Sequence, residues 1–126
     1  MKMKNVISWF EIPASDFDRA VKFYSTIFDE PVKVDEFMGQ ELGFFPMEED
    51  MDAVGGDIAP SDENNQPSPQ GTRVYFNCEG MLDAVLDRVE KAGGKIVQPK
   101  FQLGEAGWIA MIQDSEGNIV GLHSRK

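Results

Sequence analysis

The strongest constraint on the fold of this 126-residue chain is a pattern of secondary structure that the sequence predicts twice. In residues 6–58, an aromatic and β-branched strand pattern is followed by an amphipathic helix pattern and then by three short extended segments. Residues 72–124 repeat this order, and shifting the first half by 64 positions superposes the two halves without a gap. Two consecutive β-α-β-β-β units indicate an internal duplication and an α+β fold, because a doubly wound sheet would alternate strands and helices more regularly.

Helix and turn signals predict where these elements begin and end. The first helix is expected to begin within residues 15–18, Ser-Asp-Phe-Asp, and to stop before Pro31. The second helix is expected to stop at the glycine pair 93–94. Residues 114–118, Asp-Ser-Glu-Gly-Asn, are expected to form a hairpin turn into the last strand.

A linker separates the two units. Residues 60–71 contain three prolines and no apolar residue, so this stretch has nothing with which to anchor a regular element to a core. We therefore predict one domain over residues 1–126, made of a first module at 1–58, a linker at 59–71 and a second module at 72–126.

The charge of the chain is acidic and unevenly distributed. The formal net charge is −10; residues 1–58 carry 5 Lys and Arg against 13 Asp and Glu, whereas residues 72–126 balance 7 against 7. Nucleic acids and anionic membranes both require a basic surface, so we expect neither as a partner. The sequence has no run of 18 apolar residues and no secretion-signal pattern at its start, and we therefore expect a cytoplasmic protein.

Strand parity predicts which side chains line a ligand site, because alternate residues of a half-buried strand face its covering helix. The residues expected to face the helices are Val6, Phe10 and Ile12 in the first strand, Val74, Phe76 and Cys78 after the linker, and Val120 and Leu122 in the last strand. The polar and aromatic residues on the opposite faces are Trp9, Glu11, Arg73, Tyr75, Asn77 and His123. Such a mixture of rings and polar groups favours a ligand cleft over the alternative of a solvated sheet surface. The single cysteine is expected to be a small buried side chain rather than a nucleophile.

Three segments of the sequence resemble those of a known family. They are residues 16–24, Asp-Phe-Asp-Arg-Ala-Val-Lys-Phe-Tyr; residues 93–95, Gly-Gly-Lys; and the turn at 114–118, which is similar to the family's D-P-x-G-N turn with serine in place of proline. In these motifs the chain resembles the vicinal oxygen chelate superfamily, which includes glyoxalase I, extradiol dioxygenases, fosfomycin-resistance proteins and bleomycin-binding proteins. The resemblance implies that the two modules form a partly open eight-stranded barrel with the helices on the outside, and that the protein is a homodimer.

The resemblance also implies where a metal would bind. Metal-dependent members take one ligand, usually His or Glu, from the first and last strand of each module. The matching positions in this chain are Trp9, Asp57, Arg73 and Gly121. Tryptophan and glycine offer no suitable donor atom and arginine stays protonated, so we expect no standard metal site and no cofactor. A displaced site made of Glu11, Asp57 and His123 is the alternative.

The leading functional hypothesis is a metal-independent small-molecule site in the predicted cleft. The ligand-binding candidates are Trp9 and Tyr75, which offer flat contact surfaces, and Arg73 and Asn77, which would orient an anionic or carbonyl group. The candidate catalytic residues are Glu11 and His123, which would transfer protons. The resemblance implies a lyase or isomerase related to lactoylglutathione lyase, but the metal that polarises the substrate in that reaction has no replacement in this sequence.

Three other functions stay open at this point. One is sequestration of a drug or metabolite, as in the bleomycin-resistance relatives, for which the acidic first half would favour cationic ligands. Another is a metal-dependent lyase that uses the displaced site. The third is a scaffold that docks a partner through the acidic residues 47–52.

Overall fold

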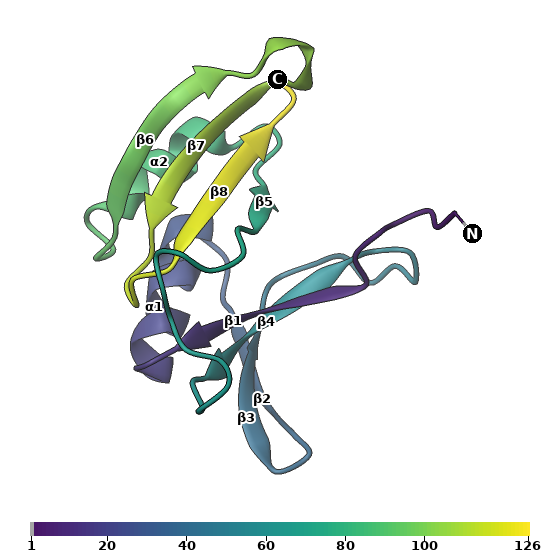
Figure 1. The fold of residues 1–126 in the computed structure, drawn as a ribbon, viewed down its shortest axis with the longest axis vertical. Helices are drawn as coiled ribbons and strands as arrows, with labels where there is room; N and C mark the ends of the chain where they lie inside the picture. Colours follow the sequence, from purple (N-terminus) through teal and green to yellow (C-terminus); the bar gives the residue numbers. More distant parts are fainter. Residues whose placement is uncertain (1) are drawn as a thin grey trace.

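The computed structural model describes residues 2–126 and contains the β-α-β-β-β pattern twice (Figure 1). Met1, the first residue of the predicted domain, lies outside the described residues. The first module consists of β1 (Trp9–Ala14), α1 (Phe17–Phe28), β2 (Lys33–Phe37), β3 (Gln40–Phe44) and β4 (Gly55–Pro60). The second consists of β5 (Tyr75–Asn77), α2 (Leu82–Val89), β6 (Lys95–Gln102), the short 3-10 helix η1 (Gly104–Ala106), β7 (Trp108–Gln113) and β8 (Ile119–Ser124).

Each module forms its own four-stranded sheet, in which the first strand pairs in parallel with the last. The strand orders are β1-β4-β3-β2 and β5-β8-β7-β6, and all other neighbours are antiparallel. The two sheets lie at an angle to each other, and α1 packs against α2 (Figure 1). This arrangement confirms the predicted α+β fold and is consistent with a barrel that is partly open. Neither helix in residues 2–126 is long and apolar enough to cross a membrane.

The internal duplication extends to the pairing register of the strands. In the first module, Glu11 of β1 lies opposite Asp57 of β4. Shifting both residues by 64 positions gives Tyr75 and Gly121, and these two residues are paired between β5 and β8. The repeat in the sequence is therefore also a repeat of strand pairing, so positions of the two modules can be compared one by one.

Helix α1 is fixed at both ends by residues close to it in the sequence. Asp16 is the N-cap, and its side chain accepts a hydrogen bond from the backbone N–H of Arg19 at 3.1 Å. At the other end Asp29 adopts a left-handed backbone conformation, with φ of 53°, and Pro31 follows. The predicted helix is confirmed, and its capping side chain is Asp16.

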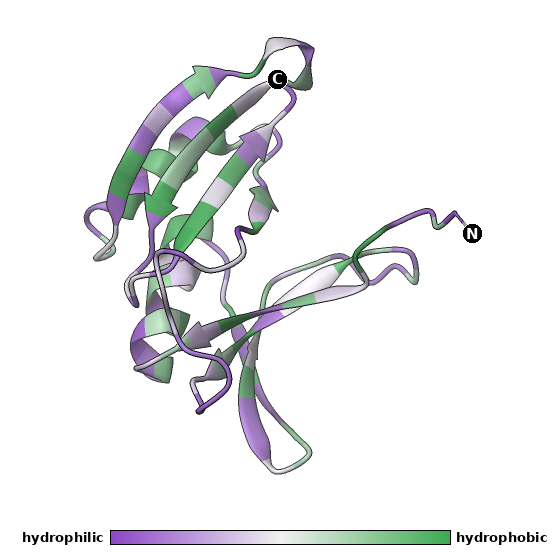
Figure 2. Cartoon of the chain, viewed as in Figure 1, coloured by the Kyte–Doolittle hydropathy of each residue, from purple (hydrophilic) through white to green (hydrophobic). Residues whose placement is uncertain are grey.

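A cluster of aromatic rings from both modules forms the centre of the core. Tyr24 of α1, Phe45 and Phe76 of β5 lie with their ring centroids between 5.2 and 5.6 Å apart. Cys78 belongs to the same core, and burial raises the pKa of its thiol to about 11, so its predicted buried role is confirmed. In Figure 2 the hydrophobic residues gather on β7 and β8, whereas the exposed strand β2 is mainly hydrophilic.

The turn at residues 114–118, the clasp turn, connects the second module to the first through hydrogen bonds and an ion pair. Asp114 Oδ2 accepts a hydrogen bond from the Tyr24 hydroxyl at 2.7 Å, and Asn118 Nδ2 donates to a backbone carbonyl of β1 at 3.0 Å. Glu116 forms an ion pair with Arg19 of α1, with 2.8 Å between Oε2 and Nε. Two of the three segments that carry the family resemblance therefore contact each other.

The prediction for the first strand is wrong at its start. β1 begins at Trp9, where its pairing with Gly55 of β4 begins, and not at residue 6. Val6 lies before the strand and is 86% exposed, so it does not pack under α1. Phe10 and Ile12 do pack in or against the core, as strand parity predicts.

Candidate functional site in a cleft between the modules

A cleft of about 910 Å³ lies between the two modules. Its walls are β1 with the residues before it, the segment between β3 and β4, and β5 with the residues before it. Five of the six residues that strand parity assigned to a ligand site line this cleft: Trp9, Glu11, Arg73, Tyr75 and Asn77. The structure therefore brings together predicted residues that are more than sixty positions apart in the sequence.

The sixth residue, His123, does not line this cleft. It is paired in register with Asn77, but its Nε2 atom lies 2.7 Å from the carbonyl oxygen of Ala106 in η1. The imidazole thus contacts the loop between β6 and β7. Strand parity predicts the side of the sheet on which His123 lies, but it does not predict whether the ring extends into the cleft or toward η1.

A network of three side chains on β1 and β4 forms one wall of the site. Trp9 Nε1 donates a hydrogen bond of 2.8 Å to Asp57 Oδ2. Asp57 is only 3% exposed and lies opposite Glu11, whose own side chain is exposed in the cleft. Desolvation is the largest cause that raises the pKa of Glu11, and the hydrogen bond and negative charge of Asp57 and the charge of Asp62 raise it further, to about 7.

The other wall carries an aromatic ring at the corresponding position. Tyr75 lies opposite Gly121 of β8, and a Cβ added to this glycine would lie 2.6 Å from Tyr75 Cε1. Trp9 lies in a similar way beside its own register partner, Gly55, where an added Cβ would lie 3.2 Å from the indole Cζ3. A glycine on the neighbouring strand therefore leaves room for each ring.

The positions at which related proteins hold a metal do not fit a metal in this chain. The Asp57 carboxylate is engaged by the Trp9 indole, and the Tyr75 ring covers Gly121. The displaced set is not assembled either, because Glu11 and Asp57 are adjacent while His123 contacts η1. In the part of the chain that the structure describes, no group of three or more His, Cys, Asp and Glu side chains is arranged to hold a metal ion.

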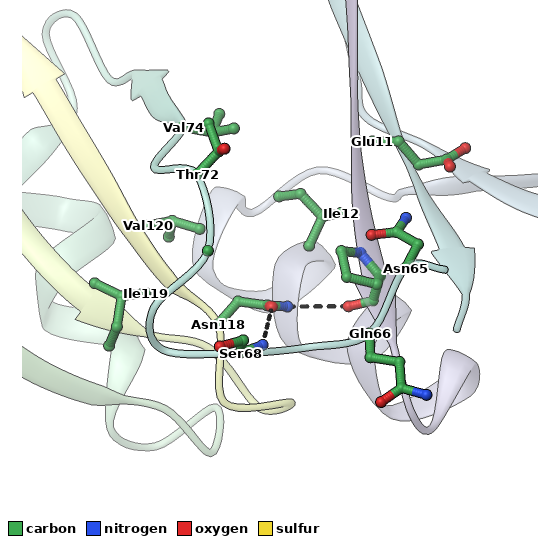
Figure 3. Close-up of a pocket in the computed structure, with 12 residues that line it drawn as sticks. Glu11, Ile12, Asn65, Gln66, Ser68, Thr72, Val74, Asn118, Ile119 and Val120 are labelled. Atoms are coloured by element: carbon green, nitrogen blue, oxygen red, sulfur yellow. Dashed lines mark hydrogen bonds between the residues drawn. The ribbon is translucent and has the colours of Figure 1, made fainter. Parts of the chain in front are cut away.

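A second, smaller pocket of about 200 Å³ adjoins the cleft and shares Glu11, Thr72 and Val74 with it. The linker closes this pocket, where Ser68 N donates to Asn118 Oδ1 at 3.1 Å (Figure 3). Figure 3 also shows that the Glu11 side chain points away from Asn118. The carboxyl group is therefore directed away from the hydrogen bond between Ser68 and Asn118.

Some residues of the site were not found by sequence reasoning. The segment between β3 and β4 contributes Pro46 and Met47 to the cleft. The sequence had grouped Asp57 with Glu11 as a candidate metal ligand, but the hydrogen bond from Trp9 to Asp57 was not predicted. The loop residues carry no comparable signal in the sequence.

Comparison with known proteins agrees with the fold. The family model of the Glyoxalase/Bleomycin resistance protein/Dioxygenase superfamily matches residues 6–122. The chain belongs to this superfamily. The match confirms the resemblance that the helix, glycine and turn motifs indicated.

Individual relatives are distant in sequence. A glyoxylase-like domain-containing protein of Didymella fabae is 30% identical over 131 residues, which cover 99% of this chain and 98% of the relative. The protein named "Putative glyoxylase CFP32" of Mycobacterium tuberculosis is 28% identical over 120 residues, and the match spans 91% of this chain but only 44% of that relative. The crystal structure of a glyoxalase/bleomycin resistance protein from Albidiferax ferrireducens is similar in fold, with a TM-score of 0.74, 18% identity, and coverage of 97% of this chain and 100% of the other.

Proposed function

We propose that this protein binds a small organic molecule in the cleft between its modules, without a metal ion, and that it acts on this molecule as a lyase or isomerase. The observation that carries the proposal is the convergence of two aromatic rings, an arginine and a carboxyl group on one cleft from both modules. Glu11 is the proposed proton-transfer group, because its pKa of about 7 is suited to give and take protons at neutral pH. His123 is left out of the proposal because it lies outside the cleft lining and contacts η1.

The remaining cleft residues would bind and orient the ligand. Trp9 and Tyr75 lie on opposite walls and would contact a flat part of the ligand from both sides. None of the ion pairs in residues 2–126 involves Arg73, so its guanidinium is available to an anionic group of the ligand. Asn77 would hydrogen-bond to a carbonyl oxygen. Together these groups favour a carbonyl compound that carries a carboxylate.

Ligand binding by variants tests this proposal. A set of carboxylate-bearing carbonyl compounds would be screened by thermal shift, and the hits measured by isothermal titration calorimetry. Because a hydrogen bond to a charged group contributes about 1.5–3 kcal/mol, Arg73→Ala is expected to weaken binding by about 10- to 150-fold. Arg125→Ala, which removes the same charge from an exposed position outside the cleft, is the matched control. Equal affinities for the wild type and Arg73→Ala would contradict the proposed site.

The second candidate function is sequestration of a ligand without a reaction. It is favoured by the width of the cleft and by the exposure of its two aromatic side chains, because Trp9 is 43% and Tyr75 is 48% exposed. Recovery of the ligand after denaturation separates the two functions. An enzyme would return a converted molecule, and Glu11→Gln would bind the ligand but return it unchanged. Intact ligand recovered from the wild type under all conditions would favour sequestration.

We also propose that the protein is a homodimer. Four apolar side chains are exposed around the cleft: Val6, Ile7, Met47 and Val54, with exposed fractions from 40% to 86%. A group of exposed apolar residues next to a binding cleft is typical of a surface that a second chain covers. Native mass spectrometry would measure the mass of the assembly, and a monomer at micromolar concentration would contradict this part of the proposal.

A further inference from the structure

Asp57 has a buried oxygen atom whose hydrogen-bonding capacity is not used. Its Oδ2 atom accepts the hydrogen bond from the Trp9 indole, whereas its Oδ1 atom is buried and has no hydrogen-bond partner among the described residues. A buried carboxylate oxygen without a donor is costly, and such atoms are rare in folded proteins. This atom therefore requires a physical explanation.

Glu11 is the side chain that is placed to supply the missing donor. It is the register partner of Asp57 on the parallel strand, so both side chains lie on the same face of the sheet, and Asp57 is among the groups that raise the pKa of Glu11. Two ionised carboxylates can only accept hydrogen bonds, so a bond between them requires one proton. Two carboxyl groups at paired positions on adjacent strands also do not both ionise readily, which favours a single shared proton.

We propose that Glu11 and Asp57 hold one proton between them as a carboxyl pair, in which Asp57 is a positioning residue and Glu11 exchanges the proton with the contents of the cleft. Trp9 orients the pair, because its indole engages Oδ2 and leaves Oδ1 without a partner. Asp57 is too buried to contact a ligand directly, so it acts through Glu11.

The use of this pair in catalysis rests on the proposed function. In an isomerisation, the O–H bond of Glu11 breaks as its proton passes to a carbonyl oxygen of the substrate. The resulting Glu11 carboxylate then takes a proton from carbon, and the pair returns to its starting state. Atoms and charges balance without a further reactant.

The charged groups around Glu11 support the same assignment. Asp57 faces it from β4, Asp62 acts on it from the segment after β4, and both raise its pKa. Arg73 lines the same cleft from the second module. A pKa raised to about 7 places the release of this proton close to neutral pH.

Titration of the ligand-free protein tests the pair. The glutamate carboxyl carbons would be labelled with ¹³C and followed by NMR from about pH 4 to 9. One signal is expected to titrate near 7 in the wild type and to be absent from Glu11→Gln. Asp57→Asn is expected to weaken the proton affinity of Glu11 by more than about tenfold, because it removes the negative charge of the partner and replaces a charged acceptor by a neutral amide.

Asp62→Asn is the matched control, because it removes the same charge from the position whose effect on Glu11 is the smallest. A wild-type Glu11 that titrates near 4.5, or an equal shift in Asp57→Asn and Asp62→Asn, would overturn the proposal. Since no ligand is present, this result does not depend on the proposed function. Titration of Glu11 near 7, together with unaltered ligand binding by Arg73→Ala, would instead count against the proposed function alone.

Discussion

Replacing Tyr24 by phenylalanine tests whether the clasp turn holds the two modules together. The Tyr24 side chain is fully buried, and its hydroxyl donates a hydrogen bond of 2.7 Å to Asp114 Oδ2. The substitution removes this oxygen and leaves the ring, so the aromatic core keeps its packing. Asp114 keeps three hydrogen bonds within the clasp turn, one from Glu116 N and two from Asn118.

The expected loss of stability follows from this geometry. A hydrogen bond to a charged group contributes about 1.5–3 kcal/mol, and because the carboxylate keeps three other donors we expect a decrease of about 2 kcal/mol in the free energy of unfolding. With an entropy of unfolding of about 2.1 cal/mol/K per residue, a chain of this length loses about 4 °C in Tm per kcal/mol. The variant should therefore melt about 8 °C below the wild type.

Urea denaturation followed by circular dichroism and tryptophan fluorescence measures this loss. The midpoint should fall while the m-value stays the same, because the folded and unfolded surfaces are unchanged. Tyr75→Phe is the control: this ring is 48% exposed, and its hydroxyl has no hydrogen-bond partner within residues 2–126. A loss below about 0.5 kcal/mol in Tyr24→Phe, or an equal loss in both variants, would refute the role of the clasp turn.

Three further predictions concern the glycine under the Tyr75 ring, the buried thiol and the carboxyl pair. Gly121→Ala should destabilise the fold by about 1–3 kcal/mol, because the added methyl group meets the Tyr75 ring. In thermal unfolding, the double variant with Tyr75→Ala should recover part of this loss. A Gly121→Ala variant as stable as the wild type would contradict the position of the ring. Cys78 should react with iodoacetamide at pH 8 only after unfolding, because burial raises its thiol pKa to about 11, and rapid labelling of the native protein would contradict this. Because the pKa of Glu11 is raised from 4.5 to about 7, the folded state binds more protons than the unfolded state between these pH values. The free energy of unfolding should therefore decrease as pH rises through this range. Urea denaturation at several pH values should show a weaker decrease in Glu11→Gln than in the wild type, and the same decrease in both would oppose the assignment.

The order of the elements and the composition of the cleft are largely predictable from the sequence. The periods of strand and helix patterns assign faces to residues, and this was sufficient to place Trp9, Glu11 and Tyr75 on a common cleft. Parity contains no information on where a strand begins to pair. Val6 has the parity of a core residue, but its backbone precedes the first pairing with β4, so nothing covers it.

Contacts that depend on register were not predictable from the sequence. The hydrogen bond from Trp9 to Asp57 depends on the parallel pairing of β1 with β4, which brings together residues 48 positions apart. His123 shows the same limit, because its strand position was predicted while the contact of its ring with Ala106 depends on the path of a loop. A single sequence assigns faces more readily than neighbours.

The equivalence of Glu11–Asp57 in one module and Tyr75–Gly121 in the other has a consequence for stereochemistry. Two identical modules would give a cleft with twofold symmetry, in which a ligand would have two equal ways to bind. Here one copy of the paired position carries a carboxyl pair and the other carries a phenol ring over a glycine. A ligand therefore meets different chemistry at its two ends, and the cleft can present a single face of a prochiral molecule to Glu11.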